Sequence, residues 1–198
     1  MRRSEFAIKD KKQIEEILHS ISYGTLALAK ENKPYSIPVN FVYEDGVIYF
    51  HGAKKGRKKE YMLHNSLASF SVVEPFSMIQ SYFSSNDGLA CPATHFFRSI
   101  ICDGVVEIVE DYDTKVKALQ LLMEKLQSEG SFKHLSEDVY DKMINATEVF
   151  RFEIKEMSGK VKLGQHLPKE RYEMVLEHLQ KRGSALDQVT IQQMKENR

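Results

Sequence analysis

The sequence predicts a mainly β, α+β fold: an antiparallel sheet or barrel of about six strands with peripheral helices and a C-terminal helical tail. Strand-like runs cluster early in the chain and are joined by short turns, which favours antiparallel pairing over a doubly wound parallel sheet. No Gly-x-Gly-x-x-Gly motif follows a strand, so a dinucleotide-binding βαβ unit is not indicated. Helical periodicity is confined to segments that flank the strands.

The first third of the chain predicts a helix followed by hairpins. Residues 10–20 carry apolar side chains at helical spacing behind a capping aspartate, Asp10. Strands follow at 23–29, 35–43 and 47–50. The first turn is expected at Asn32-Lys33-Pro34, and Asp45-Gly46 suits a tight primed turn. Pro38 lies inside the second strand, which predicts an edge, a bulge or a kink that faces a ligand.

The remaining elements follow from the same patterns. A short helix is expected at 56–65, and residues 75–93 are expected to be irregular, a length that is often functional in a compact domain. Residues 111–127 form an amphipathic pattern, with apolar side chains on one stripe. The last piece of the tail is only marginally helical, and docking on the core, docking on a partner and fraying all stay open. The other predicted strands and helices are 67–73, 95–110, 147–154, 168–181 and 185–197.

Composition limits the classes of function. The 198 residues include 28 Lys plus Arg and 28 Asp plus Glu, so no global field recruits nucleic acid and an anion site must be local. No apolar run is long enough to cross a bilayer, and the first residues do not form a signal peptide, so a cytoplasmic protein without a membrane partner is expected. Cys91 and Cys102 lack zinc-site spacing and are expected to be free thiols, and no metal site is predicted.

The segment 51–59 is the most informative stretch. His51, Gly52 and Ala53 end a strand, and five cations follow within six positions before a helix begins. Free backbone N–H groups at a helix N-terminus attract anions, and Arg or Lys adds charge-assisted hydrogen bonds. The pattern therefore indicates a phosphate site, although a solvated basic turn would have the same charge. His51 could transfer a proton or orient a substrate, or could simply be satisfied by the backbone.

Two further segments could complete a ligand site. Alternation along 35–41 places Ser36, Pro38 and Asn40 on one face, where they could read the edge of a planar ligand, or form the polar face of an ordinary edge strand. Arg98 and Ser99 begin a strand beside aromatic residues and could extend an anion or flavin pocket. Cys91 lies four residues before His95, but a nucleophilic role would need a depressed pKa and a base placed nearby.

In order and spacing, these pieces resemble the flavin-binding split-barrel proteins related to pyridoxamine 5′-phosphate oxidase, and among them the 5-nitroimidazole-resistance (Nim-type) branch. The resemblance covers about residues 1–162. It predicts a split-barrel domain at 1–162 and leaves a C-terminal helical extension at 163–198 unexplained. The segments that carry it are Met1-Arg2-Arg3, 14–18, 24–27, 34–41, 49–53, 56–58, 97–101, 104–111 and 154–160.

The resemblance implies a homodimer that binds FMN at the subunit interface. By this resemblance Arg57 and Lys58 hold the phosphate, and His51 lies near the flavin and the substrate. The other cofactor-binding residues that it implies are Ser36, Pro38, Val39, Asn40, Gly52, Ala53, Arg98 and Ser99. The chain departs from the family pattern at Asp103, at 91–95, and in having no tryptophan, which leaves the choice of substrate open.

The function expected from this resemblance is an FMN-dependent oxidoreductase, similar to a nitroimidazole reductase, that reduces a small electrophilic or aromatic substrate with electrons from a separate donor. Two alternatives remain open. One is a haem-binding or haem-degrading split barrel, in which His51, His166 or His178 would have to ligate iron. The other is a flavin carrier or sensor without turnover.

Overall fold

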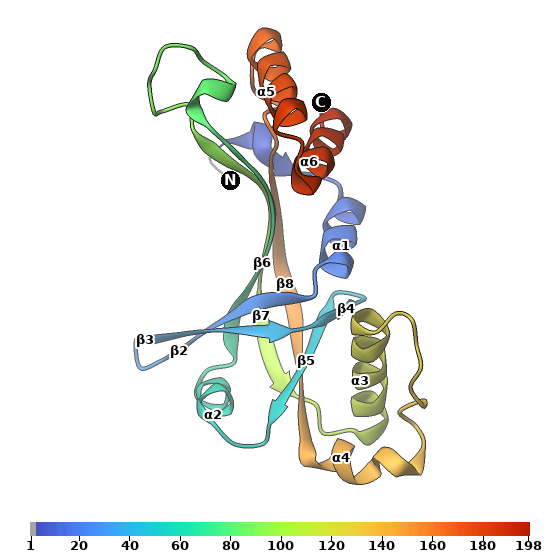
Figure 1. Ribbon diagram of the computed structural model, residues 1–198. Coiled ribbons are helices and arrows are strands. Elements are labelled where there is room, and N and C mark those ends of the chain that lie inside the picture. Colours follow the sequence, from blue (N-terminus) through green and yellow to red (C-terminus); the bar gives the residue numbers. More distant parts are fainter. Residues whose placement is uncertain (1–2) are drawn as a thin grey trace. The chain divides into compact units, whose positions relative to one another are not determined.

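The computed structural model describes residues 3–198, so Met1 and Arg2 of the predicted opening motif lie outside the described residues. Eight strands form one sheet (Figure 1). They are β1 (Ala7–Ile8), β2 (Tyr23–Lys30), β3 (Lys33–Asn40), β4 (Val42–Glu44), β5 (Val47–Ala53), β6 (Leu67–Ile79), β7 (Thr94–Ile108) and β8 (Thr147–Lys162). The helices are α1 (Lys11–Ser20), α2 (Arg57–His64), α3 (Tyr112–Leu126), α4 (Asp141–Ala146), α5 (Lys169–Arg182) and α6 (Ala185–Glu196), with short 3₁₀ turns at Ser4–Phe6, Ser81–Phe83 and Asp138–Tyr140.

The mainly β, antiparallel prediction is confirmed, and the sheet runs in the order β3-β2-β6-β7-β8-β5-β4 without closing. The count of about six strands was too low for two reasons. The second predicted strand is divided at Phe41 into β3 and β4, and the two-residue β1 pairs with the far end of β8. β8 runs to Lys162, well beyond its predicted end, and β1 pairs with it at Gly159 and Lys160.

Two tight turns set the register of the early hairpins. The turn between β4 and β5 is at Asp45 and Gly46, with φ of 47° and 85°, as predicted for a primed turn. The turn between β2 and β3 is at Glu31 and Asn32, with φ of 50° and 62°. It lies one residue earlier than expected, because Lys33 already pairs with Lys30 across the hairpin. Pro38 is on β3, an end strand of the sheet, so the edge prediction is confirmed.

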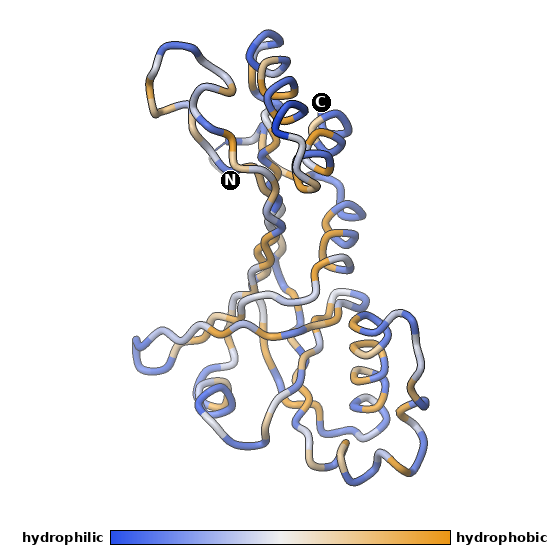
Figure 2. The backbone as a smooth tube through the Cα atoms, viewed as in Figure 1, coloured by the Kyte–Doolittle hydropathy of each residue, from blue (hydrophilic) through white to orange (hydrophobic). Residues whose placement is uncertain are grey.

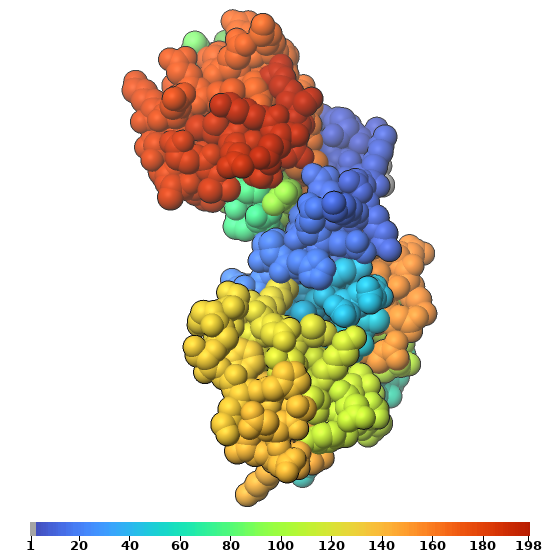
Figure 3. All heavy atoms as spheres, turned by 90° about the vertical axis from the view of Figure 1, so that its right-hand side faces the viewer, coloured from blue at the N-terminus to red at the C-terminus, as the bar shows by residue number. Residues whose placement is uncertain are grey.

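The chain forms two compact units, and β6, β7 and β8 each contribute residues to both. Among the described residues, one unit consists of residues 3–9, 73–99 and 159–198, and the other of residues 10–72 and 100–158. These limits differ from the predicted division at residue 162, which stays a prediction. In the second unit α3 buries Ala118 and Leu122, and Figure 2 shows hydrophobic and hydrophilic residues alternating around this helix. Figure 3 shows the segment after α3 lying against it.

The tail docks within the first unit. α5 buries Tyr172, Val175 and Leu179, and it packs against α6. The last helix, α6, is fixed to β6 by Asp187, whose carboxylate is fully buried and accepts a hydrogen bond from Ser77 at 2.5 Å. Of the three outcomes left open for this piece of the chain, the structure shows docking on the core, at β6.

Candidate functional site

The basic turn leads from the end of β5 into the first turn of α2 (Figure 1). Gly56 precedes the helix with φ of 128°, a conformation that favours glycine, and its carbonyl accepts the first helical hydrogen bond from Glu60 N–H at 3.1 Å. No side chain caps this end of α2. The N–H groups of the first turn therefore remain available to an anion, which is the backbone half of the predicted phosphate site.

Arg57 is held in place by aromatic rings. Its guanidinium carbon lies 4.4 Å from the ring centroid of Tyr35 and 5.0 Å from that of Tyr61, and Nη2 donates to the Tyr61 hydroxyl at 3.0 Å. Such contacts orient a guanidinium without neutralising its charge. The Tyr61 contact follows from the spacing of four residues along α2, but the Tyr35 contact depends on tertiary packing and had no signal in the sequence.

Lys58 lies close to the end of β5. Its Nζ donates to the carbonyl oxygen of His51 at 3.2 Å and is 4.9 Å from the ring centroid of Phe150. A Cβ added at Gly52 would be only 2.4 Å from this Nζ, so the position of the ammonium group requires glycine there. Burial lowers the pKa of Lys58. A bound anion would offset this desolvation by supplying an opposite charge.

The five cations of the turn differ in their partners. Lys59 forms an ion pair with the buried carboxylate of Glu148, while Lys54 and Lys55 are exposed. Within residues 3–198, no carboxylate lies within ion-pair distance of Arg57 or Lys58. The two residues expected to hold a phosphate are therefore the two that are oriented by neighbours yet still carry uncompensated charge.

His51 is exposed near the end of β5, where it pairs with Val149 of β8. Partial burial and the charge of Lys58 lower the pKa of its imidazole below the ordinary value. The ring is therefore neutral at pH 7. The sequence predicted a histidine with an ordinary pKa, so the protonated form is scarcer at neutral pH than expected. Orienting a substrate by a hydrogen bond does not need the protonated form.

The predicted alternation along β3 is present. Ser36, Pro38 and Asn40 are exposed on one face, and the Asn40 amide donates to the carbonyl of Ser22 at 3.2 Å. Val39 is half-buried, with its side chain on the opposite face opposite Gly24 of β2. A planar ligand on the exposed face could therefore reach only the backbone of Val39, and the roles assigned to these four residues stay predictions.

The exposed face continues from β3 across β2 to β6. The register places Ser36 opposite Ala27, and Ala27 opposite Ser69, so these side chains share one face. Ser69 also donates to the carboxylate of Asp103 on β7. A shallow groove of about 500 Å³ runs along this face, lined by residues such as Ala27, Leu67 and Gly104.

Arg98 and Ser99 belong to the first unit, whereas the phosphate site belongs to the second. The guanidinium of Arg98 is paired with Glu74, with Nε at 2.7 Å from the carboxylate oxygen, and both side chains are mostly buried. This pairing compensates the charge of Arg98, so it does not offer a free cation to a phosphate. Its expected role, and that of Ser99, stay predictions.

The cysteines and the tail histidines have separate surroundings. Both cysteines are free: Cys91 is exposed, and burial raises the pKa of the Cys102 thiol to about 12. His95 Nε2 lies 2.8 Å from the carbonyl oxygen of Phe76, which gives this imidazole a backbone partner. His178 stacks on Phe83 with ring centroids 4.7 Å apart, and His166 lines a pocket in the first unit.

The sequence profile of the pyridoxamine 5′-phosphate oxidase family matches residues 10–161, which include β2 to β7, most of β8 and the basic turn. The chain belongs to this family. The match ends where the resemblance read from the sequence also ends, and it leaves α5 and α6 outside. No curated protein matches the sequence.

Solved structures share the fold. A "putative 5-nitroimidazole antibiotic resistance protein" from Bacteroides thetaiotaomicron has a TM-score of 0.65 at 24% identity, over 78% of this chain and 86% of that one. The flavocytochrome Anf3 from Azotobacter vinelandii gives 0.66 at 23% identity, over 85% and 75% of the two chains. A FAD- and haem-binding protein from Mycobacterium smegmatis gives 0.67 at 18% identity, over 86% and 79%.

No helix within residues 3–198 is both long and apolar enough to span a lipid bilayer.

Proposed function

We propose that this protein binds FMN, with the phosphate held by Arg57, Lys58 and the first turn of α2. The observation that carries the proposal is the pair of oriented cations without carboxylate partners at an uncapped helix N-terminus. Membership of the pyridoxamine 5′-phosphate oxidase family supports it. Flavin binding in structural neighbours, such as the flavocytochrome and the FAD- and haem-binding protein, is consistent with it.

The residues present fit the phosphate end of this cofactor. Gly52 leaves the space that the Lys58 ammonium fills, and Arg57 offers a planar guanidinium that can form two parallel hydrogen bonds to phosphate oxygens. FMN and FAD share this phosphate chemistry. We favour FMN because its single terminal phosphate matches a compact two-cation site.

The proposed activity is that of an oxidoreductase, similar to a nitroimidazole reductase, acting on a small electrophilic or aromatic substrate. The bound flavin would supply reversible electron transfer, and the protein would supply binding and orientation. Ser36, Pro38 and Asn40 would face the ring system, and His51 would orient the substrate with its neutral imidazole. The two free thiols fit a reducing cytoplasm.

The proposal includes a second copy of the chain that covers the exposed face of β3, β2 and β6. This face carries large apolar side chains in water, among them Tyr23 at 64% and Leu67 at 65% exposure. A flavin ring lying on it would need cover from water. Leu67→Glu should shift the protein towards monomer in size-exclusion chromatography with light scattering. Val139→Glu, equally exposed on another surface, should not.

The cofactor proposal is tested by reconstitution. The purified protein should show a flavin absorption spectrum, or acquire one when FMN is added, and chromatography of the released cofactor would distinguish FMN from FAD. Arg57→Ala and Lys58→Ala should each weaken FMN by about 1–3 kcal/mol. Lys54→Ala and Lys55→Ala, the exposed cations of the same turn, serve as matched controls. Equal loss in all four variants would show a general electrostatic effect in place of a built site.

A haem-binding function is the second candidate, because two structural neighbours are a flavocytochrome and a haem-binding protein, and His166 lines a pocket here. Titration with haemin should then give a tight Soret band that His166→Ala removes. A protein that binds FMN but does not turn over with any nicotinamide donor and nitroaromatic acceptor would instead be a flavin carrier or sensor.

A further inference from the structure

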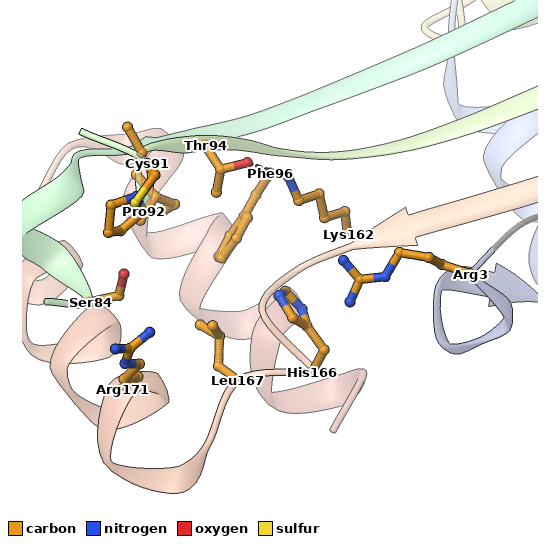
Figure 4. Close-up of a pocket in the computed structure, with 12 residues that line it drawn as sticks. Arg3, Ser84, Cys91, Pro92, Thr94, Phe96, Lys162, His166, Leu167 and Arg171 are labelled. Carbon is orange, nitrogen blue, oxygen red and sulfur yellow. Dashed lines mark hydrogen bonds between the residues drawn. The ribbon is translucent and has the colours of Figure 1, made fainter. Parts of the chain in front are cut away.

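The first unit contains a pocket of about 340 Å³ that the proposed flavin function does not use (Figure 4). Its walls come from the end of β6, the segment between β6 and β7, the start of β7, the end of β8, the segment after it and the first turn of α5, together with Arg3. All of these residues belong to one compact unit, which is not the unit that holds the phosphate site. The volume is at the lower end of the range for small-molecule sites.

One side of the pocket is apolar. Ile79 and Phe96 each have only 1% of their surface exposed, and Leu167, which also lines the pocket, is half-buried. Phe96 also lies within 3.0 Å of the position a Cβ would take at Gly164. The backbone of the segment after β8 therefore packs closely on this ring. This wall is part of the fixed core of the unit, so it offers a preformed surface to the apolar body of a ligand.

The charged side chains of the lining are cationic. Figure 4 shows Lys162 and Arg3 at one end of the pocket with the imidazole of His166, and Arg171 at the other end beside Ser84 and Leu167. No Asp or Glu is among the lining residues. Figure 4 shows the guanidinium of Arg3 directed towards Lys162 and His166. The ammonium of Lys162 donates to the hydroxyl of Thr94, which fixes its direction but leaves its charge uncompensated.

The charges of Lys162 and Arg3 act on each other and on the imidazole of His166. Burial lowers the pKa of Lys162, and the charges of Lys160 and Arg3 lower it further. Burial also lowers the pKa of His166, with Arg3 and Lys162 adding to the effect. Glu5, which is 2.6 Å from Arg3, is outside the pocket lining and compensates only part of this charge. The mutual repulsion would be relieved by an anion placed among these groups.

We propose that this pocket binds a small organic anion with an apolar, aromatic-sized body, its charged group lying against Lys162 and Arg3 and its body against Phe96 and Ile79. A carboxylate and a phosphate monoester share this chemistry. The apolar wall argues against a bare inorganic anion as the ligand. The cationic side chains argue against a neutral aromatic molecule. The proposal stands whether or not the protein binds FMN.

Alkylation of Cys91 can report whether the pocket is occupied. It lines the pocket and is exposed, whereas Cys102 is fully buried. Iodoacetamide is neutral, so the cationic wall does not attract it, and its carbon forms a bond to the Cys91 sulfur as iodide leaves. Mass spectrometry of the folded full-length protein then follows alkylation of Cys91 alone. A molecule seated in the pocket should slow this reaction in a saturable manner.

The probes separate charge from apolar contact. Phenylacetate should protect Cys91. Phenylacetamide is its neutral counterpart and acetate lacks the ring, so each should protect at least tenfold more weakly. A tenfold difference is on the order of what one charge-assisted hydrogen bond contributes. Phenyl phosphate tests the alternative charged group. Inorganic phosphate that protects as well as phenylacetate would reveal an adventitious ion only and would overturn the proposal.

Variants locate the binding groups. Lys162→Gln and Arg3→Gln should each raise the half-protecting concentration of phenylacetate roughly tenfold. Lys169→Gln removes an exposed charge from α5, outside the pocket, and should leave the concentration unchanged. Arg3 is on the surface, so its variant should fold even if Lys162→Gln does not.

Calorimetric titration of the same pairs gives a second readout that does not depend on Cys91. The proposal is overturned if phenylacetate produces neither protection nor binding heat, or if phenylacetamide matches it. It is also overturned if Lys169→Gln weakens binding as much as Arg3→Gln. Binding of phenylacetate should persist in Arg57→Ala protein that has lost FMN, so failure of the flavin proposal and failure of this one are distinguishable.

Discussion

Replacing Gly52 by alanine tests the phosphate site without removing any charge. The new Cβ would be 2.4 Å from Lys58 Nζ and 3.5 Å from the Phe150 ring. The second distance is ordinary contact, so only the end of the Lys58 side chain has to move, by about 1 Å for the ammonium to reach van der Waals separation. Gly52 is in the extended backbone of β5, where alanine is tolerated. We therefore expect a fold of unchanged or slightly higher stability with a displaced cation.

The size of the effect follows from what Lys58 loses. A displaced ammonium keeps its long-range attraction to the phosphate but loses its direct charge-assisted hydrogen bond, so FMN should weaken by about 1–2 kcal/mol, or about 5- to 30-fold in Kd. The assay is titration of cofactor-free protein with FMN, followed by quenching of flavin fluorescence. Thermal unfolding of the same samples without cofactor checks that the fold is intact.

A double-mutant cycle makes the prediction specific. In a Lys58→Ala background there is no ammonium to displace, so Gly52→Ala should have little further effect on FMN affinity. If Gly52→Ala weakens FMN equally in both backgrounds, the alanine acts by distorting β5 or by contacting the cofactor itself. If it leaves FMN affinity unchanged in the otherwise native protein, Lys58 does not hold the phosphate and the reasoning fails.

Three further predictions concern other parts of the chain. His51→Ala should keep most of the FMN and lower turnover, by about 10²-fold or more if the imidazole transfers a proton. In the native protein, a turnover that rises as the pH falls below 6.5 would match the lowered pKa of His51. Release of FMN from the variant would instead make His51 a cofactor-positioning residue. Asp187→Asn should lower the free energy of unfolding by about 2–3 kcal/mol in urea titrations at pH 7, because it breaks the pair with Arg182. Hydrogen bonds from Arg182 and Ser77 hold the pKa of Asp187 well below its ordinary value. The contribution of Asp187 to the free energy of unfolding is therefore complete above about pH 4 and declines as the pH falls further. A stability difference between native protein and variant that does not depend on pH would contradict this. Gly104→Ala would place a Cβ 2.0 Å from the carbonyl oxygen of Glu153, and we expect a loss of about 2–3 kcal/mol in stability, with a native-like melting temperature as the contrary result.

Local chemistry explains what could be predicted from the sequence. Helix caps, helical periodicity and turn residues act within a few positions of one another, and α1, α3 and the hairpin at Asp45 and Gly46 lie where these signals place them. The basic turn was also visible, because its small residues and cations are contiguous between a strand and a helix. The family match at 10–161 agrees with the order of these local motifs.

Contacts between distant residues could not be predicted in this way. The sequence shows five cations in the turn, but only packing determines that Lys59 is paired with Glu148 while Arg57 lies against Tyr35. Likewise, the two-residue β1 has no strand signal of its own and exists because β8 pairs with it. These features depend on which surfaces meet after the chain has folded.

The sequence by itself determined the class of fold, the elements in their order and the position of a cationic turn, because each depends on neighbouring residues. Tertiary structure decided which cations remain free for an anion, which face of β3 is exposed, and that α6 docks through Asp187. It also assembled the pocket around Lys162 from segments that are far apart in the sequence and show no common motif. Charge and shape at a site depend on side chains brought together from far along the chain, and burial there sets how strongly each charge acts.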